Sequence, residues 1–240
     1  MATARRLEYQ LAGLRACLER AAVAVHALRP IFVRQEQHGR APVGFRNDPQ
    51  ALVEANLMTT AYINFYSPIN PSTVQHLMAA CGNAITQGHD ELYLCLSTPG
   101  GQIASGITLY NFLRSMPIKV TTHNIGSVDS IGNAVFLAGG LRRACPHSTF
   151  MFHGTAFDML TQAHLEQKNL REMLNALLAD ERRIADILVE RTKITSDQAG
   201  QLFAEARTKN ADDAFRLGII HEICDLAIPA RTAISTLVFN

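Results

Sequence analysis

The chain has 240 residues, 48% of them hydrophobic and 18% charged, which is enough to bury a sizeable core and excludes a disordered chain. A formal net charge of +1 gives no field that would attract nucleic acid or an anionic membrane surface. The five scattered cysteines contain no Cys-x-x-Cys pair and the nine histidines no His-Glu-x-x-His motif, which argues against a disulfide framework, a metal site or any other cofactor.

The first 58 residues are expected to form a separate N-terminal element. Four leucines between residues 7 and 18 recur at three- and four-residue spacing, which predicts an amphipathic helix that packs on its own domain or on a sister subunit. Charged residues interrupt this stretch and no long apolar run occurs anywhere, so we predict a cytoplasmic protein with no signal peptide or membrane span. Residues 30–56 are polar and broken by Gly and Pro, as in a linker arm. We therefore place an arm at residues 1–58 and one domain at residues 59–240.

Strand and helix patterns alternate along this domain. The expected strands are AYINFYS (61–67), DELYLCLS (90–97), KVTTHNIGSV (119–128), STFMFH (148–153) and GIIHEI (218–223). The expected helices are residues 71–88, opened by Pro71, then 103–116, 131–140, a long stretch over about 161–191, and two short helices after it. The almost continuous apolar run of DELYLCLS is typical of a parallel strand buried on both faces. The alternation predicts an α/β layered domain.

Three strand ends carry groups suited to acyl transfer. Pro99-Gly100-Gly101 places bare backbone after a buried strand, Ser130 lies in GSVDSIG at a strand-to-helix junction, and His153 ends an apolar strand. Each also has a purely structural interpretation, as a turn, a helix N-cap and a core histidine. Together they supply oxyanion donors, a nucleophile and a base, which predicts a serine hydrolase site.

The run from LYLCLSTPGG to STFMFHG resembles the proteolytic subunit of the Clp protease. That family shows a Ser-Pro-Gly-Gly turn, a Gly-x-x-x-Ser-x-Gly segment and a Pro-x-Ser-x-x-Met-x-His strand, in this order. The corresponding segments here are 98–101, 126–132 and 146–153, and a weaker similarity extends the match over about 60–225. The Gly-x-Ser-x-Gly elbow of α/β-hydrolases is absent from the sequence, which argues against that serine class.

The resemblance implies a crotonase-type spiral of βα units and a serine endopeptidase that cleaves peptides or unfolded proteins. Ser130 is then the nucleophile, His153 the general base, and the backbone N–H groups of Gly101 and Ile131 the oxyanion hole. It also implies a homo-oligomer of rings, or stacked rings joined through the long helix around 161–191. An AAA+ unfoldase is the possible partner that such rings serve.

Two positions depart from the family. The catalytic Asp of the family aligns with Ala206, and Glu205, Asn210 and Asp212 are the polar residues nearby. Glu205 is our candidate for the third member, with a Ser–His dyad as the alternative. Asp129 stands where the family has a small residue, and a substrate contact or a charge at the helix start would account for it.

Two other classes of function remain open from the sequence. One is a ring subunit that keeps the fold without catalysis, which has less reason to retain Ser130, His153 and Gly101 together. The other is a crotonase-type enzyme acting on an acyl-CoA, since Gly-flanked oxyanion amides serve both chemistries. Labelling by a serine-directed fluorophosphonate discriminates among the three.

Overall fold

The computed structural model describes residues 59–156 and 166–237. The strands are β1 (Thr60–Tyr66), β2 (Glu91–Thr98), β3 (Lys119–Asp129), β4 (Leu141–Ala144), β5 (Thr149–Met151), β6 (Thr208–Asn210), β7 (Glu222–Ile223) and β8 (Ile234–Thr236). The helices are α3 (Pro71–Thr86), α4 (Ile103–Ser115), α5 (Gly132–Leu137), α6 (Gln167–Arg191), α7 (Ser196–Glu205) and α8 (Ala211–Arg216).

The strands form one sheet in the order β6-β5-β3-β2-β1-β8, with β4 pairing β3 and β7 pairing β4. Every pairing is parallel except that of β5 with β6. In parallel pairs the carboxyl ends of the strands meet at one edge, where ligands bind in α/β proteins. The carboxyl ends of β2, β3 and β5 therefore lie together at one edge of the sheet, which is the candidate position for a functional site.

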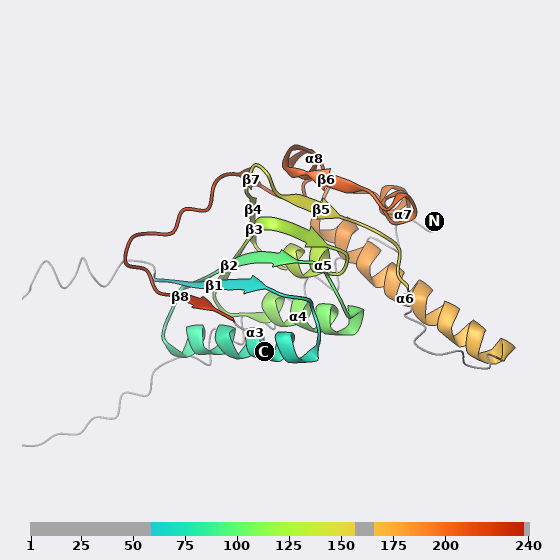
Figure 1. Ribbon diagram of the computed structural model, residues 1–240, viewed down its shortest axis with the longest axis horizontal. Helices are drawn as coiled ribbons and strands as arrows, with labels where there is room; N and C mark the ends of the chain where they lie inside the picture. The colour runs from blue at the N-terminus through green and yellow to red at the C-terminus, as the bar shows by residue number, and fades with distance from the viewer. Residues whose placement is uncertain (1–58, 157–165, 238–240) are drawn as a thin grey trace, which may run out of the picture. The chain divides into compact units, whose positions relative to one another are not determined.

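The central strands are buried because helices pack against them (Figure 1). β2 is buried along nearly its whole length, and its contacts with β1 and β3 make up the middle of the core. Cys81 of α3 and Cys95 of β2 lie inside this core, where burial raises the pKa of their thiols to about 12 and about 11. Reduced cysteines buried in this way pack as small hydrophobic side chains.

Helix α3 begins where the sequence contains Asn70-Pro71. The Asn70 side chain accepts from the Thr73 backbone N–H, and the Thr73 hydroxyl accepts from the Asn70 N–H, which forms a capping box. Pro71 occupies the first turn, where its missing N–H costs no hydrogen bond. This fixed start places Ile69, the residue before the cap, beside the turn that follows β2.

A buried arginine ties the C-terminal part of the domain to the sheet. Arg142 of β4 is only 4% exposed, and its guanidinium donates to the backbone carbonyls of Gly139, Arg191, Gly218 and Ile219. Burial lowers its pKa to about 10. Since a buried charge is tolerated only when it is hydrogen-bonded, these four carbonyls hold the end of α6 and the segment before β7 against β4.

The expected α/β architecture is confirmed, and each strand expected from an apolar run is present. The sequence pattern missed three short strands, β4, β6 and β8, and the expected strand over 218–223 is reduced to β7. The predicted N-terminal helix and the arm over 1–58 lie outside the described residues, as does the beginning of the stretch over 161–191. Within the described ranges, no helix has both the length and the apolar character needed to cross a membrane.

Candidate functional site

Ser130 lies in a strained turn between β3 and α5. Its φ of 56° is left-handed, a conformation that costs a residue with a Cβ roughly 1–2 kcal/mol. The Ser130 N–H donates to the Met151 carbonyl at 2.9 Å. The buried Asn133 amide donates to the carbonyls of Ser130 at 3.1 Å and of Met151 at 2.8 Å. The turn is thus fastened to β5, and strain held by its surroundings in this way is a feature of functional sites.

The Gly100-Gly101 turn lies directly against Ser130. A Cβ on Gly100, whose φ is 87°, would come within 2.7 Å of the Ser130 Cβ. On the other side, Ile69 N–H donates to the Gly100 carbonyl at 2.7 Å and Gln102 N–H to the Ile69 carbonyl at 2.8 Å. Both bonds involve the neighbours of Gly101, so the N–H of Gly101 takes no part in this pairing.

His153 extends beyond β5 into the same region. The residues around it alternate, with Phe150 and Phe152 buried and Met151 and His153 partly exposed on the opposite face. Its Nδ1 is 2.6 Å from the Gly154 carbonyl oxygen, so Nδ1 carries the proton and Nε2 is the basic nitrogen. Phe152 N–H donates to the Arg207 carbonyl and Gly154 N–H to the Phe203 carbonyl, which anchors this segment to the α7–β6 region.

Ser130, His153 and Gly101 line one cleft of about 230 Å³. The rest of the lining combines apolar side chains with polar backbone groups, and it comes from the turn after β2, α4, the strand end after β5, α6 and α7. These residues are Pro99, Ile103, Phe152, Gly154, Thr155, Ala156, Ile184 and Phe203. The structure therefore brings together a hydroxyl, an imidazole and a free backbone amide beside an apolar hollow. Those groups can perform nucleophilic acyl transfer on a carbonyl next to an apolar side chain.

Two of the expected site residues, Ile131 and Glu205, do not line the cleft. Ile131 directly follows Ser130 but is completely buried and is not part of the cleft lining. Glu205 ends α7 and forms an exposed ion pair with Arg207 at 3.0 Å, across the left-handed Ala206. Its role as the third member of a triad stays a prediction, in a geometry where the Nδ1 of His153 already has a backbone acceptor.

The other two polar neighbours lie at the start of α8. Asn210 caps α8, because its side chain accepts from the Asp213 N–H at 2.8 Å. Asp212 is exposed in the first turn of the same helix. Neither residue lines the cleft.

Asp129 is a half-buried acid at the end of β3. Burial raises the pKa of its carboxyl, while a hydrogen bond from Ser127, a backbone hydrogen bond at Met151 and the nearby His153 act in the opposite direction. The sequence singled out Asp129 only as a departure from the family. Its electrostatic link to His153 depends on the pairing of β3 with β5.

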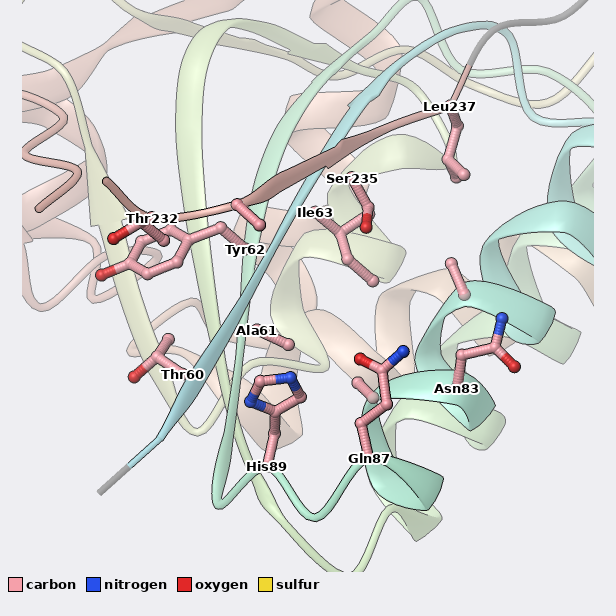
Figure 2. Close-up of a pocket in the computed structure, with 13 residues that line it drawn as sticks. Thr60, Ala61, Tyr62, Ile63, Asn83, Gln87, His89, Thr232, Ser235 and Leu237 are labelled. Carbon is pink, nitrogen blue, oxygen red and sulfur yellow. The ribbon is translucent and has the colours of Figure 1, made fainter. Parts of the chain in front are cut away.

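A second cavity, of about 360 Å³, lies at the other end of the sheet (Figure 2). Figure 2 shows its lining contributed by the first half of β1, the end of α3 with the turn after it, and the segment around β8. The His89 ring is among these residues, and its buried Nδ1 has no hydrogen-bond partner. The cavity contains the Ser235 hydroxyl and the His89 imidazole, but it lies at the N-terminal end of β1. Ser130 and His153 instead follow the C-terminal ends of β3 and β5.

Metal chemistry finds no support among the residues described. No group of three or more His, Cys, Asp or Glu side chains in these ranges could hold a metal ion. Among the described residues that line the Ser130 cleft, the polar side-chain groups are the hydroxyls of Ser130 and Thr155 and the imidazole of His153.

Sequence reasoning missed several contributors to this site. Asn133 fastens the Ser130 turn, and Ile103, Ile184 and Phe203 form apolar walls of the cleft. Asn133 follows the glycine of the Ser-x-Gly segment, and its position three residues after Ser130 is the signal that could have identified it. The apolar walls come from three separate helices, so no local pattern points to them.

Comparison with known proteins gives a consistent result. A family model described as Clp protease matches residues 47–227. The ATP-dependent Clp protease proteolytic subunit 1 of Leifsonia xyli is 29% identical over 147 residues, which is 58% of this chain and 69% of that protein. The ATP-dependent Clp protease proteolytic subunit 2 of Corynebacterium efficiens is 27% identical over 146 residues, or 57% and 68% of the two chains.

Among solved structures, a ClpP1 mutant from Listeria monocytogenes resembles the fold. The TM-score is 0.62 at 18% identity, and the match covers 74% of this chain and 95% of that one. At this identity the likeness concerns the fold alone, and it confirms the α/β architecture of the crotonase type.

Proposed function

The chain belongs to the Clp protease family, and from that premise we propose that it is a serine endopeptidase of the Clp proteolytic-subunit type. The observation that carries the proposal is the shared cleft of Ser130, His153 and Gly101. These residues come from three separate strand ends, and they match the three motifs of the family in their order along the chain.

In the proposed reaction, the Ser130 Oγ attacks the scissile carbonyl as His153 Nε2 takes its proton. Since Nδ1 is held by the Gly154 carbonyl, the ring presents Nε2 as the base without a tautomer change. The N–H groups of Gly101 and Ile131 are the proposed oxyanion donors. Gly101 already lines the cleft, whereas the buried Ile131 requires a small shift of the turn. His153 then protonates the leaving amine, and water releases the acyl group.

The cleft also supports a preference among peptides. Ile103, Phe152, Ile184 and Phe203 surround its hollow, and no Asp, Glu, Lys or Arg side chain is among the lining residues that the structure describes. Burying an apolar side chain there is favourable, while a charged one would lose its hydration without a partner. We therefore propose cleavage after apolar residues.

Covalent labelling tests the proposal directly. A serine-directed fluorophosphonate is expected to attach to the Ser130 Oγ, because an activated hydroxyl with a neighbouring base reacts much faster than an ordinary serine. Peptide mapping by mass spectrometry locates the adduct. Labelling confined to other serines, or none at all at millimolar reagent, would contradict the assignment.

The assembly is proposed from the surface of α6. This helix exposes Leu170, Leu174 and Leu178 at four-residue spacing, each more than half accessible. An apolar stripe on a surface helix is typical of an interface between subunits. We expect native mass spectrometry at micromolar concentration to give a ring or a double ring of this chain. Substituting the three leucines with serine should shift the population toward smaller species, and a wild-type monomer would contradict the proposal.

Access to a chamber gives a further expected result. The sequence contains no GxxxxGK[ST] loop that would bind nucleotide, so this chain cannot power unfolding itself. We expect short unstructured peptides and a denatured reporter to be cleaved without ATP, while the folded reporter survives unless an AAA+ unfoldase is added. The two forms are compared by gel over time. Rapid loss of the folded form without ATP or a partner would favour an open peptidase.

A non-catalytic ring subunit is the second candidate. Ala206 at the position of the family acid and the exposed ion pair of Glu205 favour it, because no carboxylate contacts Nδ1 of His153 among the described residues. Such a subunit should form rings but resist fluorophosphonate.

A further inference from the structure

The family acid has two tasks in a serine peptidase, and both must be met here without it. It holds the histidine in one tautomer, and its negative charge stabilises the imidazolium that forms in the transition state. The Gly154 carbonyl, 2.6 Å from Nδ1, accounts for the first task. A backbone carbonyl carries no net charge, so the second task requires a carboxylate elsewhere.

The pairing of β3 with β5 places Asp129 on the same face of the sheet as His153. Asp129 lies opposite Met151 in this parallel pair, and paired residues project to the same face. Val128 and Phe150, the preceding pair, are both completely buried on the core face. His153 follows Met151 by two residues and Phe152 between them is buried, so the ring returns to the face of Asp129. One strand spacing across and two residues along give a Cα separation of about 8 Å.

The surroundings of Asp129 keep its carboxylate in this position. Ser127, opposite Thr149 on the same face, favours the charged form of this carboxyl, whereas burial raises its pKa. The carboxyl is half-buried, and His153 is among the groups that favour its charged form. A half-buried charge acts on its neighbours with an effective dielectric constant well below that of water.

Other charged groups also lie near His153. On α6, the Glu181 carboxylate lies 3.7 Å from the Cβ position of Gly154, which makes it the rival source of the negative charge. At the α7–β6 junction, Glu205 and Arg207 neutralise each other. Lys209 of β6 is opposite Phe150 and therefore belongs to the other face.

We propose that Asp129 is a positioning residue that supplies the negative charge for the His153 imidazolium, while the Gly154 carbonyl fixes the tautomer. The inference rests on the proposed peptidase function. In this arrangement the Gly154 carbonyl and Asp129 share the two tasks that one Asp performs in the family. The arrangement also gives a role to Asp129, which stands next to Ser130 where the family has a small residue.

Asp129→Asn tests the inference with two readouts. In the Ser130→Ala background, NMR titration of isotope-labelled histidine should place the His153 midpoint at lower pH in Asp129→Asn than in the parent, because an ionised neighbour favours the imidazolium. In the active chain, kcat/KM for a fluorogenic peptide should fall about tenfold on the plateau, and the acid limb of its pH profile should move the same way. Asp129→Glu keeps the negative charge, so it should retain most of the kcat/KM and a His153 midpoint close to that of the parent. Asp129→Ala replaces Asp129→Asn in both measurements if the Asn variant does not fold.

Asp212→Asn is the matched control, since it is the same change on the exposed surface of α8 and should alter neither readout. An unchanged His153 midpoint in Asp129→Asn would overturn the inference. So would a loss of activity in Glu205→Gln or Glu181→Gln that exceeds the loss in Asp129→Asn. Full hydrolysis by Ser130→Ala would instead remove the proposed function, whatever the NMR titration shows.

Discussion

Ser130→Ala is expected to lower kcat/KM for short fluorogenic peptides by at least about 10³-fold while the fold is retained. The hydroxyl is the only group in the proposed mechanism that forms a bond to substrate, so no neighbour can replace it. Alanine accepts the left-handed φ of 56° as well as serine does, because both have a Cβ. The turn should also persist, since its hydrogen bonds to Met151 and Asn133 use backbone atoms of residue 130. Kinetics and thermal unfolding are measured on the same preparation.

Ser115→Ala is the matched control for this experiment. Ser115 ends α4, is exposed, and donates only to the Phe112 carbonyl of its own helix at 2.8 Å. Its loss should leave kcat/KM unchanged. Undiminished hydrolysis by Ser130→Ala would assign the activity to another residue or to a contaminating peptidase, and a mock preparation from cells that do not express this chain separates these two cases.

The parallel core could be predicted from sequence because strands buried on both faces have nearly continuous apolar runs. β1, β2 and β3 are rich in apolar and β-branched residues, and they are separated by helices of ordinary length. The strands β6 and β8 have the sequences TKN and IST, which are too short to show an apolar run. They are strands because a partner at the sheet edge offers hydrogen bonds, and this tertiary context overrides a weak local preference.

The candidate site shows the same division. Ser130, His153 and the Gly100-Gly101 turn were predictable because each is bound to a strand end in a recognisable motif. The Gly154 carbonyl that accepts from His153 Nδ1 could not be predicted, because its position depends on the direction in which the backbone leaves β5. Glu205 was chosen for its closeness to Ala206 in sequence. The left-handed Ala206 turns the chain there and sets Glu205 against Arg207.

Gly101→Ala should produce the largest effect of any single methyl group added near the site. A Cβ on Gly101 would lie 2.1 Å from the Ile69 carbonyl oxygen and 2.9 Å from two further backbone atoms, and φ is 148°. All three atoms belong to the Ile69 backbone, so no flexible side chain can yield and the turn itself must move. We expect a loss of about 2–4 kcal/mol in the free energy of unfolding. We also expect a fall of about 10²–10³-fold in kcat/KM, because the proposed oxyanion donor is displaced.

Gly82→Ala separates this effect from the general cost of replacing glycine. Gly82 lies inside α3, and a Cβ there meets no atom within 4 Å. Because alanine is the better helix former, this variant should gain about 0.5–1 kcal/mol in stability and keep its activity. Urea unfolding gives the stability of both variants, and kcat is expressed per site titrated with fluorophosphonate. If Gly101→Ala keeps wild-type kcat/KM per titrated site, its N–H is not an oxyanion donor, and the role passes to the amide of Ile131 alone.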